Sequence, residues 1–304
     1  WQFGVAALED RSCLRVGSHA KLPRAMLLRS SSLPALSRTA RRALSGSCCP
    51  PGALPALAAD EDRDLDGQVI QLDDVNHYVV AAEGTARGGL IVAYDVFGFS
   101  GGRIKSVCDS FAKCGFNVIM PDVYTGTEIN GFGGLDGFMS GAEETVGWIS
   151  AQNPAKYMPM LEGCKAFLAG EMGSANVGGF GLCWGAVPVF HAAGAGIIRA
   201  GVSAHPSLQA AGFYGEPGQP GEFAAKTGKC PMLLLPAQED SLDDYGEEGA
   251  VTAAVRDLGF ACVSHPFPEM HHGFVARGDT SDAATARDVE TALQISADFF
   301  AEHL

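Results

Sequence analysis

The sequence predicts an α/β protein in which a mostly parallel, doubly wound sheet is covered by helices on both faces within a single domain. After Asp60, short apolar runs alternate with longer segments of helical period. This alternation is typical of parallel strands joined by crossover helices. The chain has 304 residues, of which 47% are hydrophobic, so it has enough apolar side chains to bury one large core.

The elements follow from the same pattern. Strands are predicted over 90–95, 116–122, 176–181, 200–205, 231–237 and 261–267. Helices are predicted over 103–114, 153–169, 184–194, 244–258 and 284–302. The glycine-rich segments 124–141 and 207–229 lack a strong period, and we expect them to be long loops. Both follow strands, at the sheet edge where open α/β sheets bind their ligands.

The first 59 residues differ from the rest in charge. They carry eight Lys/Arg against two Asp/Glu, whereas residues 60–304 carry thirteen against thirty-three. From Met26 to Asp60 the chain is rich in Arg, Ser, Leu and Ala, as transit peptides are. We therefore expect 1–59 to be a disordered or transit-peptide leader to a mitochondrion or plastid, and 60–304 to be the folded domain. Without import the protein would be cytoplasmic. A basic tail that binds an acidic partner is the alternative.

Charge and composition restrict the partners. The formal net charge of −14 argues against nucleic acid, because phosphate binding needs a basic face. No apolar run approaches the ~18 residues that cross a bilayer, so we expect no membrane partner. The nine cysteines form no CxxC pair, which favours a reducing compartment over a disulfide framework. A small-molecule partner is expected, with the protein a monomer or weak homo-oligomer.

One cysteine stands where a nucleophile would stand. In "GGFGLCWGAVPVF", Cys183 lies between Gly181 and Gly185, at the change from a strand-like to a helix-like run. The spacing is that of the G-x-nucleophile-x-G elbow, whose tight turn requires glycine on both sides. The position also lies at a helix N-terminus, which favours a thiolate. A small buried cysteine is the alternative. A dinucleotide-binding loop would need glycine where Trp184 stands.

The partners of a nucleophile appear downstream in the expected order. In a nucleophile elbow fold, the acid follows one later strand and the histidine follows the next. Asp240 comes just after the predicted strand 231–237, and His271 and His272 come after 261–267. The sequence therefore predicts that all three groups meet at the carboxyl edge of the sheet.

Four motifs together resemble one known family. "AYDVFGFS", "GFGLCWGA", "PAQEDSLDD" and "HHGFVARGD" are similar to the dienelactone hydrolase family of α/β-hydrolases, in particular its carboxymethylenebutenolidase-like eukaryotic branch. The resemblance covers about 68–303. It implies an α/β-hydrolase fold and hydrolysis of a lactone or small ester through a thioester. Cys183 would be the nucleophile, Asp240 the acid and His272 the base. No cofactor and no metal are implied.

The resemblance also implies roles around the nucleophile. Asp95, in "YDVFG", would help to ionise the thiol, although it is one methylene shorter than the glutamate of bacterial members. The backbone N–H groups of Val96 and Trp184 would hold the oxyanion. Two rival interpretations remain: a ligand-binding or scaffold protein that has lost activity, and a different thiol protein such as a peptidase or a peroxide sensor. The sensor would need a resolving cysteine, and none lies near Cys183 in the sequence.

The substrate residues depart from the bacterial pattern. Bacterial members bind a substrate carboxylate with two arginines, one of which follows the "PD-x-Y" strand end. Here Thr125 and Gly126 follow Tyr124, so that arginine is missing. Arg277, in "HHGFVARG", corresponds to the other arginine with one extra residue of spacing. The resemblance thus places Arg277 and Tyr124 at the substrate and implies that neutral lactones or esters suit the site better than a carboxylated dienelactone.

Overall fold

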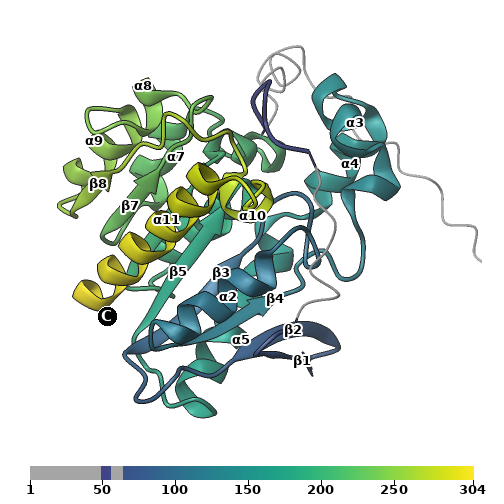
Figure 1. Cartoon of the computed structure of the whole chain (residues 1–304). Helices are drawn as coiled ribbons and strands as arrows, with labels where there is room; N and C mark the ends of the chain where they lie inside the picture. The colour runs from purple at the N-terminus through teal and green to yellow at the C-terminus, as the bar shows by residue number, and fades with distance from the viewer. Residues whose placement is uncertain (1–48, 56–63) are drawn as a thin grey trace, which may run out of the picture. The chain divides into compact units, whose positions relative to one another are not determined.

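Eight strands form one sheet in the part of the chain that the computed structural model describes, residues 49–55 and 64–304 (Figure 1). The strand order is β1-β2-β4-β3-β5-β6-β7-β8. The strands are β1 Gln68–Leu72, β2 Val75–Val80, β3 Gly88–Ala93, β4 Phe116–Pro121, β5 Val177–Leu182, β6 Ala200–Ala204, β7 Met232–Leu235 and β8 Cys262–Ser264. From β4 to β8 all neighbours are parallel, whereas β1 pairs antiparallel with β2, and β2 with β4.

The mostly parallel α/β prediction is confirmed, and each of the six predicted strands is present. Strands β3 to β7 are buried at every residue, which explains their near-continuous apolar sequences. The edge hairpin of β1 and β2 was not predicted. β1 is mostly exposed, and its sequence QVIQL neither alternates strictly nor forms a continuous apolar run, so it gives a weak signal.

Helices cover both faces of the sheet, as Figure 1 shows. On one face, α2 (Ile104–Lys113) contacts α11 (Ala283–His303). On the other, α6 (Ala186–Gly194) lies between α5 (Pro154–Gly170) and α7 (Pro220–Thr227). A further helix, α9 (Ala250–Asp257), packs on α7 and β8.

The two segments predicted as loops contain helices, which corrects the prediction. Residues 124–141 include η1 (Ile129–Phe132) and α3 (Gly134–Ser140), and α4 (Glu143–Ala151) follows. Residues 207–229 include η3 (Leu208–Tyr214) and α7. Glycine obscured α3, because Gly133 and Gly141 at its two ends have φ of 91° and 70° and act as caps. The predicted helix 244–258 is divided into α8 (Leu242–Tyr245) and α9.

The predicted leader lies outside the described residues except for 49–55, and the described residues all belong to the unit that spans 37–304. Among these residues, none of the helices combines the length and the apolar character that crossing a bilayer requires. The parallel strands bring the segments after β3, β5, β7 and β8 to one edge of the sheet, where the predicted site residues meet.

Candidate active site

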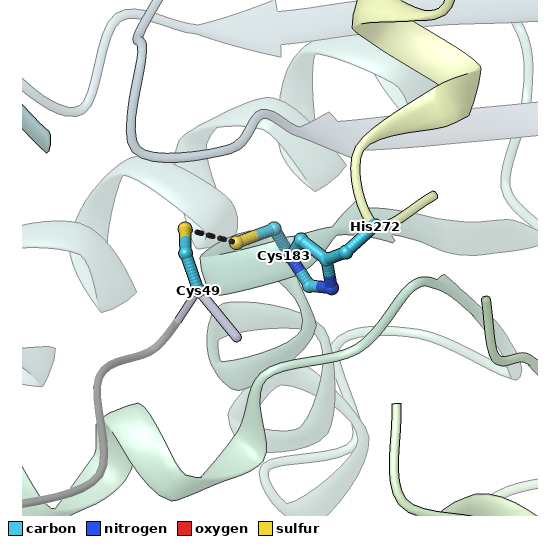
Figure 2. A group of neighbouring side chains, drawn as sticks. All are labelled: Cys49, Cys183 and His272. Atoms are coloured by element: carbon cyan, nitrogen blue, oxygen red, sulfur yellow. Dashed lines mark hydrogen bonds between the residues drawn. The ribbon is translucent and has the colours of Figure 1, made fainter. Parts of the chain in front are cut away.

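Cys183 stands on a sharp turn between β5 and α6, in the short helix η2 (Cys183–Gly185). Its side chain is labelled in Figure 2. Its φ is 53°, a left-handed conformation that a side-chain-bearing residue rarely adopts. A Cβ on Gly181 would lie 2.4 Å from the carbonyl oxygen of Gly185, and a Cβ on Gly185 would lie 2.1 Å from that of Ala93. Both glycines are therefore required, and the turn is seated directly on the end of β3.

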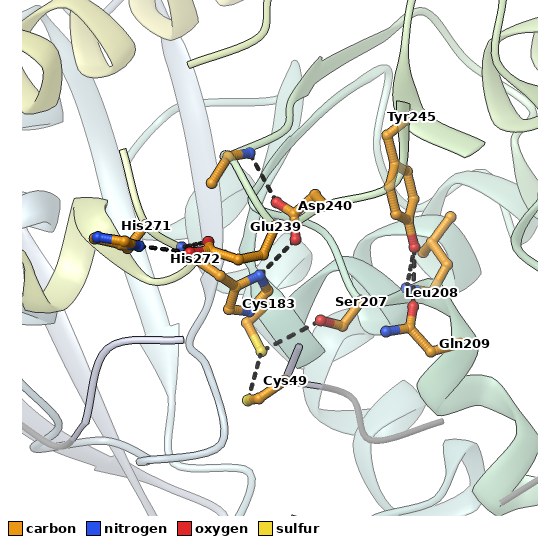
Figure 3. A network of polar contacts seen from close by, with 11 residues as sticks. Cys49, Cys183, Ser207, Leu208, Gln209, Glu239, Asp240, Tyr245, His271 and His272 are labelled. Atoms are coloured by element: carbon orange, nitrogen blue, oxygen red, sulfur yellow. Dashed lines mark hydrogen bonds and ion pairs between the residues drawn. The ribbon is translucent and has the colours of Figure 1, made fainter. Parts of the chain in front are cut away.

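Asp240 and His272 form a buried pair beside this cysteine (Figure 3). Asp240 follows β7, and its Oδ1 lies 2.6 Å from His272 Nδ1. Its other oxygen accepts a 2.8 Å hydrogen bond from the N–H of Ala237, which fixes the carboxylate. An imidazole nitrogen of His272 lies within 4.8 Å of Cys183 Sγ. The structure thus brings together the three groups that the sequence placed after separate strands.

The protonated form of His272 is favoured by its neighbours. Burial alone lowers the pKa of its imidazole, but the charges of Asp240 and Cys183 outweigh burial and hold this pKa well above the usual value. This is the electrostatic arrangement that supports an imidazolium next to a thiolate.

Glu239 and Ser207 contact these groups and were not predicted. Glu239 Oε2 accepts a 2.7 Å hydrogen bond from the backbone N–H of His272, and Oε1 lies 2.5 Å from His271 Nδ1. Ser207 Oγ lies 3.5 Å from Cys183 Sγ, and its N–H donates to the Cys183 carbonyl at 3.1 Å. Their positions just beyond β7 and β6 were the available signal. Glu239 thus fixes the histidine loop, residues 265–273, and Ser207 fixes the turn at residues 183–185, which is called the nucleophile turn below after the role predicted for Cys183.

His205 packs against the imidazole ring of His272. It follows β6 with φ of 38°, and its ring centroid lies 5.0 Å from that of His272. Burial lowers the pKa of His205 to about 3. Neither of its ring nitrogens has a hydrogen bond with the described residues. His205 is therefore an uncharged packing group against the imidazole of His272.

Asp95 and Arg277 are paired with each other. Arg277 Nη1 contacts Asp95 Oδ2, and both side chains are buried. The N–H of Phe97 donates to Asp95 Oδ1 at 2.9 Å, and the guanidinium lies 4.6 Å from the Phe97 ring centroid. Gly273 makes room for this group, because a Cβ there would lie 2.0 Å from Arg277 Nη2. The carboxylate after β3 therefore has its counter-charge on α10 (Phe274–Arg277), the short helix that follows the two histidines.

Tyr124, Trp184 and Val96 are all buried around the turn. The ring centroid of Tyr124 lies 5.1 Å from that of Trp184 and 4.8 Å from that of Tyr94. Its hydroxyl donates to the carbonyl of Asp95 at 3.4 Å. Since the nucleophile turn rests on the end of β3, the backbone of Trp184 lies on the same side of the sheet edge as that of Val96. Tyr124 forms part of the aromatic wall there.

Residues 49–55 cover the site. Cys49 Sγ lies 3.7 Å from Cys183 Sγ. The N–H of Leu54 donates to the His272 carbonyl at 2.9 Å, and Arg277 Nε donates to the Leu54 carbonyl at 3.1 Å. Cys183 and His272 have no exposed surface beneath this segment. Sequence spacing could not reveal this contact, because Cys49 belongs to the predicted leader and is separated from Cys183 by 134 positions.

Several known proteins are similar to this chain in sequence or in fold. The profile of the dienelactone hydrolase family matches residues 75–304. "Hydrolase pyvD" of Aspergillus violaceofuscus is 22% identical over 233 residues, 76% of this chain and 86% of the relative. "Carboxymethylenebutenolidase homolog" of Rattus norvegicus is 26% identical over 218 residues, 69% and 80% of the two chains. A solved structure from Klebsiella pneumoniae, named for dienelactone hydrolase, has a TM-score of 0.61 at 18% identity and covers 79% of this chain and all of that chain.

The fold and the groups at its edge define an α/β-hydrolase. The eight-stranded sheet, the turn after β5, and an acid and a histidine after later strands are the features of that class. The chain belongs to the dienelactone hydrolase family, because the family profile covers three quarters of it. It is an ester hydrolase of this family.

Proposed function

We propose that the protein hydrolyses a lactone or a small ester through a thioester on Cys183, with His272 as the base and Asp240 as the acid of the triad. The observation that carries this proposal is the buried 2.6 Å contact between Asp240 and His272, next to a cysteine held at φ of 53°. The names of curated relatives, carboxymethylenebutenolidase homologues among them, support a lactone or ester substrate.

The chemistry follows from the positions of these groups. Cys183 Sγ attacks the carbonyl carbon, and the ester C–O bond breaks as His272 gives a proton to the leaving oxygen. In a lactone, that oxygen stays attached as a hydroxyl on the acyl chain. Water then gives a proton to His272 and attacks the thioester, which releases the acid and restores the thiol. Asp240 keeps the imidazole in the tautomer that both steps need.

The oxyanion of both steps would be held by the N–H groups of Val96 and Trp184, which lie at the joined ends of β3 and β5. Removal of one such donor typically costs about 10²–10³ in rate. Asp95 would help to ionise the thiol only after its ion pair with Arg277 breaks, because the two side chains are in contact in this structure. A substrate also reaches Cys183 only when residues 49–55 move away from it.

The test is acyl transfer to a single sulfur. An activated ester such as 4-nitrophenyl acetate should label the full chain at Cys183, and the label should be removed by neutral hydroxylamine, which cleaves thioesters. Cys183→Ala should lower turnover by roughly 10³-fold or more. Cys114→Ala is the matched control, because this half-exposed cysteine at the end of α2 lies outside the site.

Persistent turnover in Cys183→Ala, with an intact fold by circular dichroism, would show that another group is the nucleophile. A wild-type chain that binds lactones but neither turns them over nor forms the acyl thiol would support the ligand-binding alternative instead.

A further inference from the structure

Three groups of the covered site have the chemistry of metal ligands. Cys49 Sγ, Cys183 Sγ and an imidazole nitrogen of His272 all lie within 4.8 Å of one another. Figure 2 shows these three side chains side by side. All three residues have no exposed surface. They come from three distant parts of the sequence, so no motif with a fixed spacing could have predicted this group.

The separation of the two sulfurs fits one metal between them. Zinc–sulfur bonds of about 2.3 Å at a tetrahedral angle place two sulfurs roughly 3.8 Å apart. The observed distance is 3.7 Å. A disulfide would need about 2.05 Å, so the sulfurs are not placed as a bonded pair. A weak S–H···S contact has the same length as a metal-bridged pair, so this distance is compatible with both, and the imidazole nearby adds a third donor that suits a metal.

His272 is oriented as a metal-binding histidine would be. Its Nδ1 faces Asp240 at 2.6 Å, whereas its Nε2 is buried and makes no hydrogen bond of ordinary geometry with a described residue. Histidines that bind metals commonly donate the other ring N–H to a carboxylate, which fixes the ring. The pair that would orient a catalytic base therefore orients a ligand equally well.

Cys49 is held in place by the segment that carries it. Within residues 49–55, the N–H of Ala53 donates to the Pro50 carbonyl at 3.1 Å and closes a turn. Beyond the turn, Leu54 is bonded on both sides, to the carbonyl of His272 and to Arg277 Nε. The segment that carries Cys49 is thus hydrogen-bonded to His272 and to Arg277.

We propose that Cys49, Cys183 and His272 bind a zinc ion, which holds residues 49–55 over the site and prevents hydrolysis. Two thiolates and one imidazole are a donor set that favours zinc over magnesium or calcium. Two protons leave when the metal binds, one from the Cys49 thiol and one from the Cys183–His272 pair, and the two sulfur charges neutralise the dication. A fourth position stays open for water. The inhibition, though not the metal binding, rests on the function proposed above, because zinc would occupy both its nucleophile and its base.

We would probe this site with cobalt(II). The full chain is first prepared with reduced cysteines and without bound metal. We expect one equivalent of Co²⁺ to give thiolate-to-cobalt charge-transfer absorption with tetrahedral visible bands, and Zn²⁺ to displace it. Loss of an outer partner costs metal sites about 10–100-fold in affinity, so Cys49→Ser should lose at least about 100-fold. Cys114→Ser, remote from the site, should bind cobalt like the wild type.

The inhibition has its own test. One equivalent of Zn²⁺ should stop ester turnover in the wild type, and a chelator should restore it. Cys49→Ser should stay active at that zinc concentration.

Two results would overturn the zinc site: cobalt spectra without thiolate absorption, or unchanged affinity in Cys49→Ser. A reduced chain that binds no metal but links Cys49 to Cys183 on exposure to hydrogen peroxide would also overturn it, in favour of a disulfide. The two proposals fail separately. The expected cobalt spectrum in a chain without esterase activity would leave the metal site standing, and an active esterase without the spectrum would leave only the hydrolase.

Discussion

The pairing of Asp95 with Arg277 determines, at the scale of single residues, what charge the site can accept. Both side chains are buried, and the carboxylate also accepts the N–H of Phe97. The family resemblance implies that Arg277 lies at the substrate and Asp95 near the thiol, and the structure shows the two in contact. A substrate carboxylate would have to displace Asp95 before it could bind Arg277, and this exchange replaces one ion pair with another.

We therefore expect neutral lactones and small esters to be turned over as well as carboxylated ones, or better. A single charge-assisted contact is worth about 1.5–3 kcal/mol, and this gain is offset by the Asp95 contact that is lost. The measurement is kcat/KM for a carboxylated lactone and for its methyl ester.

The control must keep the buried site neutral. Arg277→Ala alone would leave Asp95 uncompensated, at a cost of about 3–5 kcal/mol in stability. The double variant Asp95→Asn/Arg277→Gln avoids this. A preference for the carboxylate of about a hundredfold, roughly 2.7 kcal/mol, that vanishes in the double variant would show that Arg277 still serves as an anion site.

At the scale of secondary structure elements, the nucleophile turn depends on close packing of backbone on backbone. Gly185 directly precedes α6 as its N-cap and faces the carbonyl oxygens of Ala93 and Tyr94, where a Cβ would come within 2.7 Å of both. The neighbouring helix α5 carries Gly163, where a Cβ would meet nothing within 4 Å. Only the first of these two glycines is required by close backbone packing, whereas the second has room for a side chain.

Gly185→Ala should lower the free energy of unfolding by at least about 1–3 kcal/mol, because the added methyl group pushes the turn away from β3. It should also reduce ester turnover by moving Cys183 from its position. Gly163→Ala should be neutral or stabilise by about 0.4–1 kcal/mol. Urea unfolding of both variants checks this, and equal effects would show that the seat on β3 is looser than described.

The contact of α5 with α6 should make stability depend on pH. Tyr157 Oη lies 2.6 Å from His191 Nδ1, and burial lowers the pKa of His191 to about 4. The unfolded chain, with a histidine pKa near 6.5, binds the proton more tightly, so stability falls as the pH drops from about 6.5 to 4. The loss should reach roughly 3 kcal/mol near pH 4. His191→Gln should remove this part of the pH dependence, as measured by urea unfolding between pH 7 and pH 4.5. If the variant loses stability with falling pH as steeply as the wild type, His191 has an ordinary pKa in the folded chain and this prediction is wrong.

At the scale of the whole molecule, the predicted leader reaches the active site. Residues 49–55 contact His272 and Cys183, yet none of the eight strands includes them. The match to the family also begins only at residue 75. The segment is therefore an addition over a hydrolase domain that is complete in its sheet.

A chain that begins at Asp60 should fold and hydrolyse esters at least as fast as the full chain, because Cys183 and His272 lose their cover. It should also lose the thiolate-to-cobalt absorption, since Cys49 is absent. Thermal unfolding and ester turnover of the two chains make the comparison. An inactive or unfolded shorter chain would show that residues 49–55 are part of the domain and would argue against a leader that ends at residue 59.

The sequence by itself determined the α/β class, the six inner strands and the order of Cys183, Asp240 and His272. Each of these signals is local: strands buried on both faces need continuous apolar runs, and a tight turn needs its glycines. The edge hairpin and α3 were missed for the same reason, since a half-exposed strand and a helix bounded by glycines lack such a pattern.

Only the tertiary structure decided which of these residues touch. It paired Asp95 with Arg277, set Glu239 under the histidine loop and placed Cys49 on Cys183. These contacts join residues far apart in the chain, and no periodicity or spacing records them. They exist because parallel strands deliver their carboxyl ends to one edge of the sheet, where the charges and thiols of distant segments must compensate one another once water is excluded.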